Sequence, residues 1–244
     1  MAAPFSLADF TYAHRGLWSA DGAPENSIAA FDAAADAGIA IEFDVRLSKD
    51  GVPVCFHDRT LDKMTDQTGE LADYTAAELT SFNLAGTTST IPLLEDVLSR
   101  WPHHLPLLVE VKAMDIPPVP VAKATAEQVD RYAGRAAIIS FNKEAVATIP
   151  DSIPRGLLIE KIHKSSHAEF EASLEDALAL KVDLLSIWRD DVEHAAPFAA
   201  EHGLGLVTWT VQTLQQSRDV APFADAQIFE SFSPDLVTPS LFNR

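Results

Sequence analysis

The sequence predicts an α/β protein, a distorted (β/α)8 barrel, and three observations lead to this prediction. Eight short runs rich in Val, Ile, Leu and Phe recur along the 244 residues, segments with helical spacing separate most of them, and no linker interrupts the alternation. Strands that alternate with helices indicate parallel strands joined by helical crossovers. Eight such units in a chain of about 250 residues are typical of a closed barrel. An open, doubly wound sheet is the alternative with the same alternation.

The expected strands are short and apolar, and they span residues 10–14, 40–45, 107–111, 136–141, 155–160, 183–187, 205–211 and 226–230. The first helical segment begins in the sequence "PENS", where Asn26 or Ser27 is a suitable N-cap after a proline. Further segments with helical spacing and good helix formers are expected at residues 121–134, 167–180 and 190–203.

One pair of strands departs from this pattern. Only the sequence "SKDG" separates the strand at 40–45 from the apolar run "VPVCFHD", which leaves no room for a crossover helix. The two runs must therefore form an antiparallel hairpin. With the turn at Lys49–Val52, we expect Asp44 to stand opposite His57, with Glu42 on the same face as Asp44.

The hairpin is followed by residues 59–92, which carry weak strand signals and several turn residues. We predict that this segment is a small insertion after the second strand that caps one end of the barrel. Residues 1–244 are then expected to form a single catalytic domain that includes it.

Composition narrows the possible partners. The formal net charge of −18 disfavours nucleic acid and anionic lipid. No apolar run reaches the ~18 residues needed to cross a bilayer, and the first ten residues lack the features of a secretory signal. Cys55 is the only cysteine, which excludes an internal disulfide and fits a reducing compartment. We expect a cytoplasmic protein with a small-molecule substrate and no stable membrane insertion, and the sequence predicts no particular oligomeric state.

Acidic side chains gather on the expected strands. In a barrel, reactive residues belong at the carboxyl ends of the strands. Glu42 and Asp44 share one strand and Glu110 lies on the next, where buried carboxylates are costly unless a cation or metal pairs with them. Three carboxylates suit a hard divalent cation, Mg²⁺ or Ca²⁺. Ligation by histidines is the alternative, and it would favour zinc.

Histidines and cations occur at the same strand ends. His14 and Arg15 end the first strand, His57 follows the hairpin, and Lys112 follows Glu110. Taken alone, each has a simpler explanation, such as a histidine bonded to a backbone carbonyl or a lysine paired with its neighbouring glutamate. Their convergence favours an active site.

Six motifs, taken together, resemble the glycerophosphodiester phosphodiesterase family. "AHRG", "PENS", "EFDVRLSKDGVPVCFHDRTLD", "VEVK", "SF" and "WTV" occur in that order over nearly the whole chain, and residues 41–62 are the most specific part. The resemblance implies a distorted (β/α)8 barrel and hydrolysis of glycerophosphodiesters to sn-glycerol 3-phosphate and an alcohol.

The resemblance also implies residue roles. By match of motif, His14 and His57 are the general acid/base pair, and the ligands of a divalent metal are Glu42, Asp44 and Glu110. The residues that match phosphate- and substrate-binding positions are Arg15, Lys112, Glu25, Asn26 and Trp209.

Two positions depart from the family pattern. Gln212 follows "WTV" where the family has asparagine, and Glu230 stands in "FES" where an aspartate is usual. Both are expected at the rim, where they bear on substrate choice more than on activity.

Two alternative functions remain open. A phospholipase-D-like activity on lysophospholipids would require an apolar entrance loop, and residues 59–92 show no long apolar surface. A non-catalytic phosphoester-binding barrel would not need two histidines beside a metal. The head group, the native metal, the order of acid and base, and the choice of water or a glycerol hydroxyl as nucleophile do not follow from the sequence.

Overall fold

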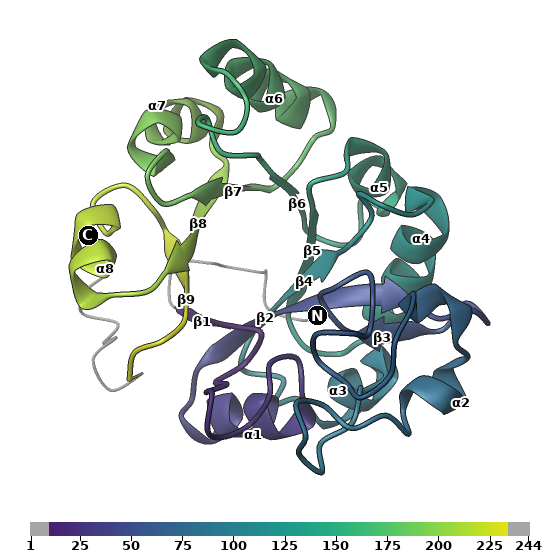
Figure 1. Cartoon of the computed structure of the whole chain (residues 1–244). Coiled ribbons are helices and arrows are strands. Elements are labelled where there is room, and N and C mark those ends of the chain that lie inside the picture. Colours follow the sequence, from purple (N-terminus) through teal and green to yellow (C-terminus); the bar gives the residue numbers. More distant parts are fainter. Residues whose placement is uncertain (1–9, 234–244) are drawn as a thin grey trace.

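The computed structural model describes residues 10–233, in which eight parallel strands close into a barrel with helices around it (Figure 1). Around the ring the strand order is β1-β9-β8-β7-β6-β5-β4-β2, and pairing of β1 with β2 closes it. The predicted (β/α)8 barrel is confirmed, and the open sheet is wrong.

All eight predicted strands are present, and no end differs from the prediction by more than two residues. They are β1 (Tyr12–His14), β2 (Ala40–Leu47), β4 (Leu107–Val111), β5 (Ala136–Ser140), β6 (Arg155–Leu158), β7 (Leu184–Trp188), β8 (Gly205–Val211) and β9 (Ala226–Phe229). Nearly all of their residues are buried, as expected for strands covered on both faces.

The four predicted helices are α1 (Ile28–Asp36), α4 (Pro118–Val129), α6 (His167–Ala179) and α7 (Val192–His202). Four shorter helices were not predicted, because a helix of seven residues or fewer carries little periodic signal. They are α2 (Ala76–Leu79), α3 (Leu94–Arg100), α5 (Lys143–Thr148) and α8 (Leu214–Val220). Side-chain caps begin three of these, Thr75 at α2, Asn142 at α5 and Thr213 at α8. Within the described residues, none of the helices is long and apolar enough to span a bilayer.

The predicted hairpin is present, but its register is one residue away from the prediction. Strand β3 (Pro53–Cys55) runs antiparallel to the end of β2, with Val45 opposite Cys55, so that Asp44 stands opposite Phe56 instead of His57. The cause is the loop, which has three residues where we predicted two. Gly51 adopts the left-handed conformation with φ 80°, and its N–H donates to the Ser48 carbonyl at 3.0 Å, as in common three-residue hairpin loops.

Apolar side chains form three clusters. The largest fills the layer between the strands and the helices. The second, which we call the inner cluster, lies inside the barrel and comprises Tyr12, Ala40, Leu108, Ala137, Ile139, Leu158, Leu184, Val207, Ala226 and Ile228. The third joins β3 to the segment 59–92 through Val54, Phe56, Leu61, Leu71, Leu79, Leu84 and Ile91. That segment also contains α2 and the 3-10 turn Leu71–Asp73.

Candidate active site

The candidate site lies directly above the inner cluster. Along a strand, residues two apart point to the same side, so the residue two positions beyond an inner-cluster residue also points into the barrel, nearer its carboxyl end. The residues placed in this way include His14, Glu42, Glu110, Trp209 and Glu230. The carboxyl end of the barrel is therefore lined by polar and aromatic groups.

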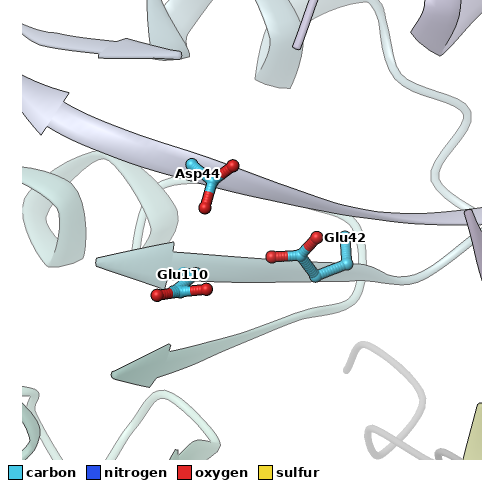
Figure 2. A group of neighbouring side chains, drawn as sticks. All are labelled: Glu42, Asp44 and Glu110. Carbon is cyan, nitrogen blue, oxygen red and sulfur yellow. The ribbon is translucent and has the colours of Figure 1, made fainter. Parts of the chain in front are cut away.

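Three buried carboxylates form what we call the acidic cluster: Glu42, Asp44 and Glu110. Parallel pairing sets Asp44 beside Glu110, and one oxygen atom from each of the three residues lies within 4.8 Å of the others. Figure 2 shows the three side chains projecting from β2 and β4 into the same space. The predicted common face of Glu42 and Asp44 is therefore confirmed.

The acidic cluster has too few hydrogen-bond donors for its oxygens. Glu42 Oε2 and Asp44 Oδ1 are buried without a hydrogen-bond partner. Burial raises the pKa of Glu42 well above its usual value, and the charges of Asp44 and Glu110 raise it further. Burial also acts to raise the pKa of Asp44, but Lys112 and Arg15 outweigh it and hold this pKa well below the usual value.

These features fit a hard divalent cation. Buried acceptor oxygens without donors are costly, and a metal ion would satisfy them. The potential ligand group found among residues 10–233 contains carboxylates alone, and oxygen ligands are those that hard divalent cations take.

Asn26 fixes the position of Asp44. Its side-chain Nδ2 donates to Asp44 Oδ2 at 2.8 Å, and the Asp44 backbone N–H donates to Asn26 Oδ1 at 3.2 Å. Both Asn26 (φ 54°) and Arg15 (φ 58°) adopt left-handed backbone conformations, and the Asn26 N–H donates to the Arg15 carbonyl at 3.0 Å. The "AHRG" and "PENS" motifs therefore hold each other, and together they hold β2.

Two other residues of "PENS" begin the helix and face the site, respectively. Ser27 is the N-cap of α1, and its Oγ accepts from the Ala30 N–H at 3.1 Å. Glu25 points back toward the site and accepts from Arg15 Nη1 at 2.8 Å.

Two cations approach the acidic cluster. Lys112 Nζ donates to Glu110 Oε1 at 2.8 Å and lies 3.5 Å from Asp44 Oδ1. Arg15 Nε lies 3.2 Å from Asp44 Oδ2. Burial acts to lower the pKa of both cations, yet the neighbouring carboxylates raise it above its usual value, so both stay charged.

The two histidines have similar partners. His14 Nδ1 lies 2.7 Å from Glu230 Oε2, and His57 Nδ1 lies 2.7 Å from Asp58 Oδ1. His14 Nε2 lies 3.9 Å from Glu42 Oε2, at the edge of the acidic cluster. His57 follows Phe56, the residue that stands opposite Asp44, and a positive charge on its ring acts to lower the pKa of Asp44.

Glu230 and Gln212, which the sequence placed only at the rim, form a hydrogen-bonded pair beside His14. Gln212 Nε2 donates to Glu230 Oε1 at 2.8 Å, while the other oxygen of Glu230 binds His14. Burial acts to raise the pKa of Glu230, but the hydrogen bond and charge of His14, the hydrogen bond from Gln212 and the charge of Arg15 together lower it to about 2. The two departures from the family pattern are therefore one bonded pair. Their positions at the ends of the adjacent strands β8 and β9 were a signal that could have revealed it.

Aromatic rings line another part of the mouth. Trp188 and Trp209 pair in register at the ends of β7 and β8, with ring centroids 5.3 Å apart, and Phe141 lies 5.5 Å from Trp209. We call these three rings the aromatic wall. Trp209, expected among the substrate-binding residues, packs on the inner cluster, which places it within the barrel mouth.

The geometry can now be set beside known proteins. A family model described as the glycerophosphoryl diester phosphodiesterase family matches residues 14–231. The chain belongs to this family.

The chain also resembles glycerophosphodiester phosphodiesterases of other organisms. Glycerophosphodiester phosphodiesterase 1 of Bos taurus is 25% identical over 242 residues, which cover 84% of this chain and 72% of that protein. Glycerophosphodiester phosphodiesterase of Bacillus subtilis is 25% identical over 252 residues, which cover 93% of this chain and 84% of that protein.

One of the solved structures that the chain resembles is a complex with a ligand. It is an Oleispira antarctica phosphodiesterase in complex with the product sn-glycerol-3-phosphate, with a TM-score of 0.78, 25% identity and coverage of 95% of this chain and 96% of that chain. Together these findings confirm the family resemblance, the barrel and the expected enzyme class, a glycerophosphodiester phosphodiesterase.

Proposed function

We propose that the chain hydrolyses glycerophosphodiesters to sn-glycerol 3-phosphate and an alcohol, with a divalent metal ion and with His14 and His57 as general acid and base. The observation that carries the proposal is the buried acidic cluster beside two histidines, each bonded to a carboxylate through Nδ1. The bound product in the Oleispira antarctica phosphodiesterase supports the choice of product.

In this proposal Glu42, Asp44 and Glu110 hold the ion, Mg²⁺ or Ca²⁺. When bound, such an ion supplies positive charge to the non-bridging phosphate oxygens. The three carboxylates already converge in the structure, which supports a site that requires little rearrangement.

Arg15 and Lys112 bind the phosphate in this proposal. Each already touches a carboxylate of the site, and each has further N–H donors, since a guanidinium carries five and an ammonium three. Charge-assisted hydrogen bonds from these donors would strengthen as negative charge builds on the phosphoryl oxygens.

The two histidines move the protons. A carboxylate on Nδ1 holds the proton on that nitrogen and leaves Nε2 free to take up or release one. One histidine removes a proton from the nucleophile and the other protonates the leaving oxygen. Each transfer typically contributes ~10²–10⁴-fold to the rate.

We also infer a small diffusible substrate and a cytoplasmic setting. The net charge of −18 supports the first, and the buried free thiol of Cys55 fits a reducing compartment. The segment 59–92 belongs to the same catalytic unit in this proposal, because it shares its apolar cluster with β3.

The direct test is product release. Purified protein is incubated with glycerophosphoglycerol or glycerophosphocholine and Mg²⁺ or Ca²⁺, and sn-glycerol 3-phosphate is measured with a coupled dehydrogenase. We expect release that stops in excess chelator and returns when the ion is added back. Full activity in chelator would contradict the metal role, and no release from either substrate with either ion would contradict the function.

A further inference from the structure

A lysine lies on the aromatic wall. Lys161 follows β6, and its Nζ lies 3.3 Å from the ring centroid of Trp188 and 5.4 Å from that of Trp209. Both distances are within the ~6 Å range of cation–π contacts. Arg189 Cζ lies 4.0 Å from the Trp188 ring centroid, so this ring already has two cationic neighbours.

The two cations differ in how they are held. Arg189 Nη1 donates to the Thr210 carbonyl at 3.0 Å, and its Nε lies 3.5 Å from Asp190 Oδ1. Within residues 10–233, the Lys161 ammonium has no ion pair and no hydrogen bond, and it contacts the rings alone. Burial and the charges of Lys164 and Arg189 lower the pKa of Lys161, while the charges of Glu160 and Asp190 act to raise it. The Lys161 ammonium therefore stands at the mouth as a positive charge without a direct ion pair.

The aromatic wall faces the reaction site from across the barrel. Figure 1 shows β7 and β8 on the opposite side of the ring from β2 and β4, which carry the acidic cluster. Two polar groups at the wall lack hydrogen-bond partners, since Trp209 Nε1 and the neighbouring Ser186 Oγ are buried and unbonded. Ser186 lies two residues before Trp188 on β7 and so points to the same side.

A phosphodiester has two organic arms, and an arm that crosses the barrel from the acidic cluster meets this wall. A quaternary ammonium group would bind there through the aromatic faces, but Lys161 and Arg189 already cover Trp188, and like charges repel. A hydroxyl-rich arm could accept a hydrogen bond from Lys161 and from Trp209 Nε1.

We propose that Lys161 and the aromatic wall form the subsite of the departing alcohol, and that Lys161 selects against cationic head groups. The preferred substrates are then glycerophosphodiesters whose alcohol is a neutral polyol or an anion. This inference rests on the proposed function, and it names the substrate class of the same site.

The test compares two substrates that differ in the charge of the alcohol. The ratio of kcat/KM for glycerophosphocholine to kcat/KM for glycerophosphoglycerol is measured for the unaltered protein and for Lys161→Met. We expect the unaltered protein to prefer glycerophosphoglycerol and Lys161→Met to raise the ratio by about ten-fold or more. The matched control is Lys164→Met, an exposed neighbouring lysine, which we expect to leave the ratio within about two-fold.

Lys161→Gln keeps the length and polarity of the side chain, and it repeats the test if the methionine variant fails to fold. An unchanged ratio in the folded variant overturns the inference. An equal loss on both substrates also overturns it, because Lys161 would then act on the shared phosphate. If the unaltered protein hydrolyses neither substrate, the proposed function fails; if it hydrolyses both and the ratio does not move, only this inference fails.

Discussion

The two halves of the barrel mouth are held by different forces. In the charged half, formed at β1, β2, β4 and β9, side chains bind one another at hydrogen-bond distance, as His14 binds Glu230 and Asn26 binds Asp44. In the aromatic half, formed at β5–β8, rings contact rings and cations, and polar atoms such as Trp209 Nε1 lack partners. Hydrogen bonds fix direction and distance, whereas stacking tolerates displacement. The charged half is thus suited to reacting atoms and the aromatic half to a variable substituent.

The largest effect is expected from the histidines of the charged half. His14→Ala and His57→Ala should each lower kcat by ~10²–10⁴-fold, because each removes a proton-transfer group. Steady-state rates at saturating substrate and metal measure this, with circular dichroism to show that the fold is kept. The control is His104→Ala, an exposed histidine, which should leave kcat unchanged. Near-normal turnover in either active-site variant would contradict the acid/base assignment.

For the acidic cluster, the difference in Tm between Glu42→Gln and the unaltered chain should change sign when the metal ion is added. In the metal-free protein, Glu42→Gln removes one of three crowded carboxylates, so its Tm should equal or exceed that of the unaltered chain. Saturating Mg²⁺ or Ca²⁺ should raise the Tm of the unaltered chain by about 5–10 °C but leave that of Glu42→Gln nearly unchanged.

Thermal unfolding with and without the ion measures the Tm of each protein. Glu127→Gln on the exposed face of α4 serves as the control. An ion-induced rise of equal size in Glu42→Gln would place the metal elsewhere.

Glu230 tests whether the charged half depends on direction as well as charge. Glu230→Gln should lower kcat by about ten-fold with little change in KM, because it replaces a charge-assisted hydrogen bond to His14 with a neutral one. Gln212→Ala should have a smaller effect of the same kind, since Glu230 keeps its charge but loses one partner. A change confined to KM in both variants would mean that the pair contacts substrate instead of positioning His14.

Of these variants, the smallest effect is expected from Trp209 in the aromatic half. Trp209→Phe keeps a ring against Phe141 and Trp188 but loses the indole N–H, so KM should rise by about two- to five-fold while kcat changes little. Steady-state kinetics with glycerophosphoglycerol measures both constants. A fall in kcat as large as that of Glu230→Gln would remove the distinction between the two halves.

The sequence predicted the elements better than the contacts between them. Alternating apolar runs located all eight barrel strands, and the common face of Glu42 and Asp44 followed from the period of a strand. The hairpin register was wrong because one additional loop residue, accommodated by Gly51, shifts every pair along the strands.

Contacts between distant segments had no local signal. The bond between Gln212 and Glu230 joins residues that were judged separately, although their strands are neighbours in the ring. The contact of Lys161 with Trp188 depends on the path of the chain after β6, which periodicity does not specify. The roles of the site residues as catalysts and ligands stay predictions.

The bond between His14 and Glu230 joins two residues that are 216 positions apart, and it lies where β1 meets β9. During synthesis, His14 is made 216 residues before Glu230. His14 on β1 can therefore bind Glu230 only after β9 has been made and has paired with β1. Contacts between residues so far apart in the sequence form slowly. Catalytic competence would then appear only after the ring has closed, which makes enzyme activity a reporter of the final step of folding.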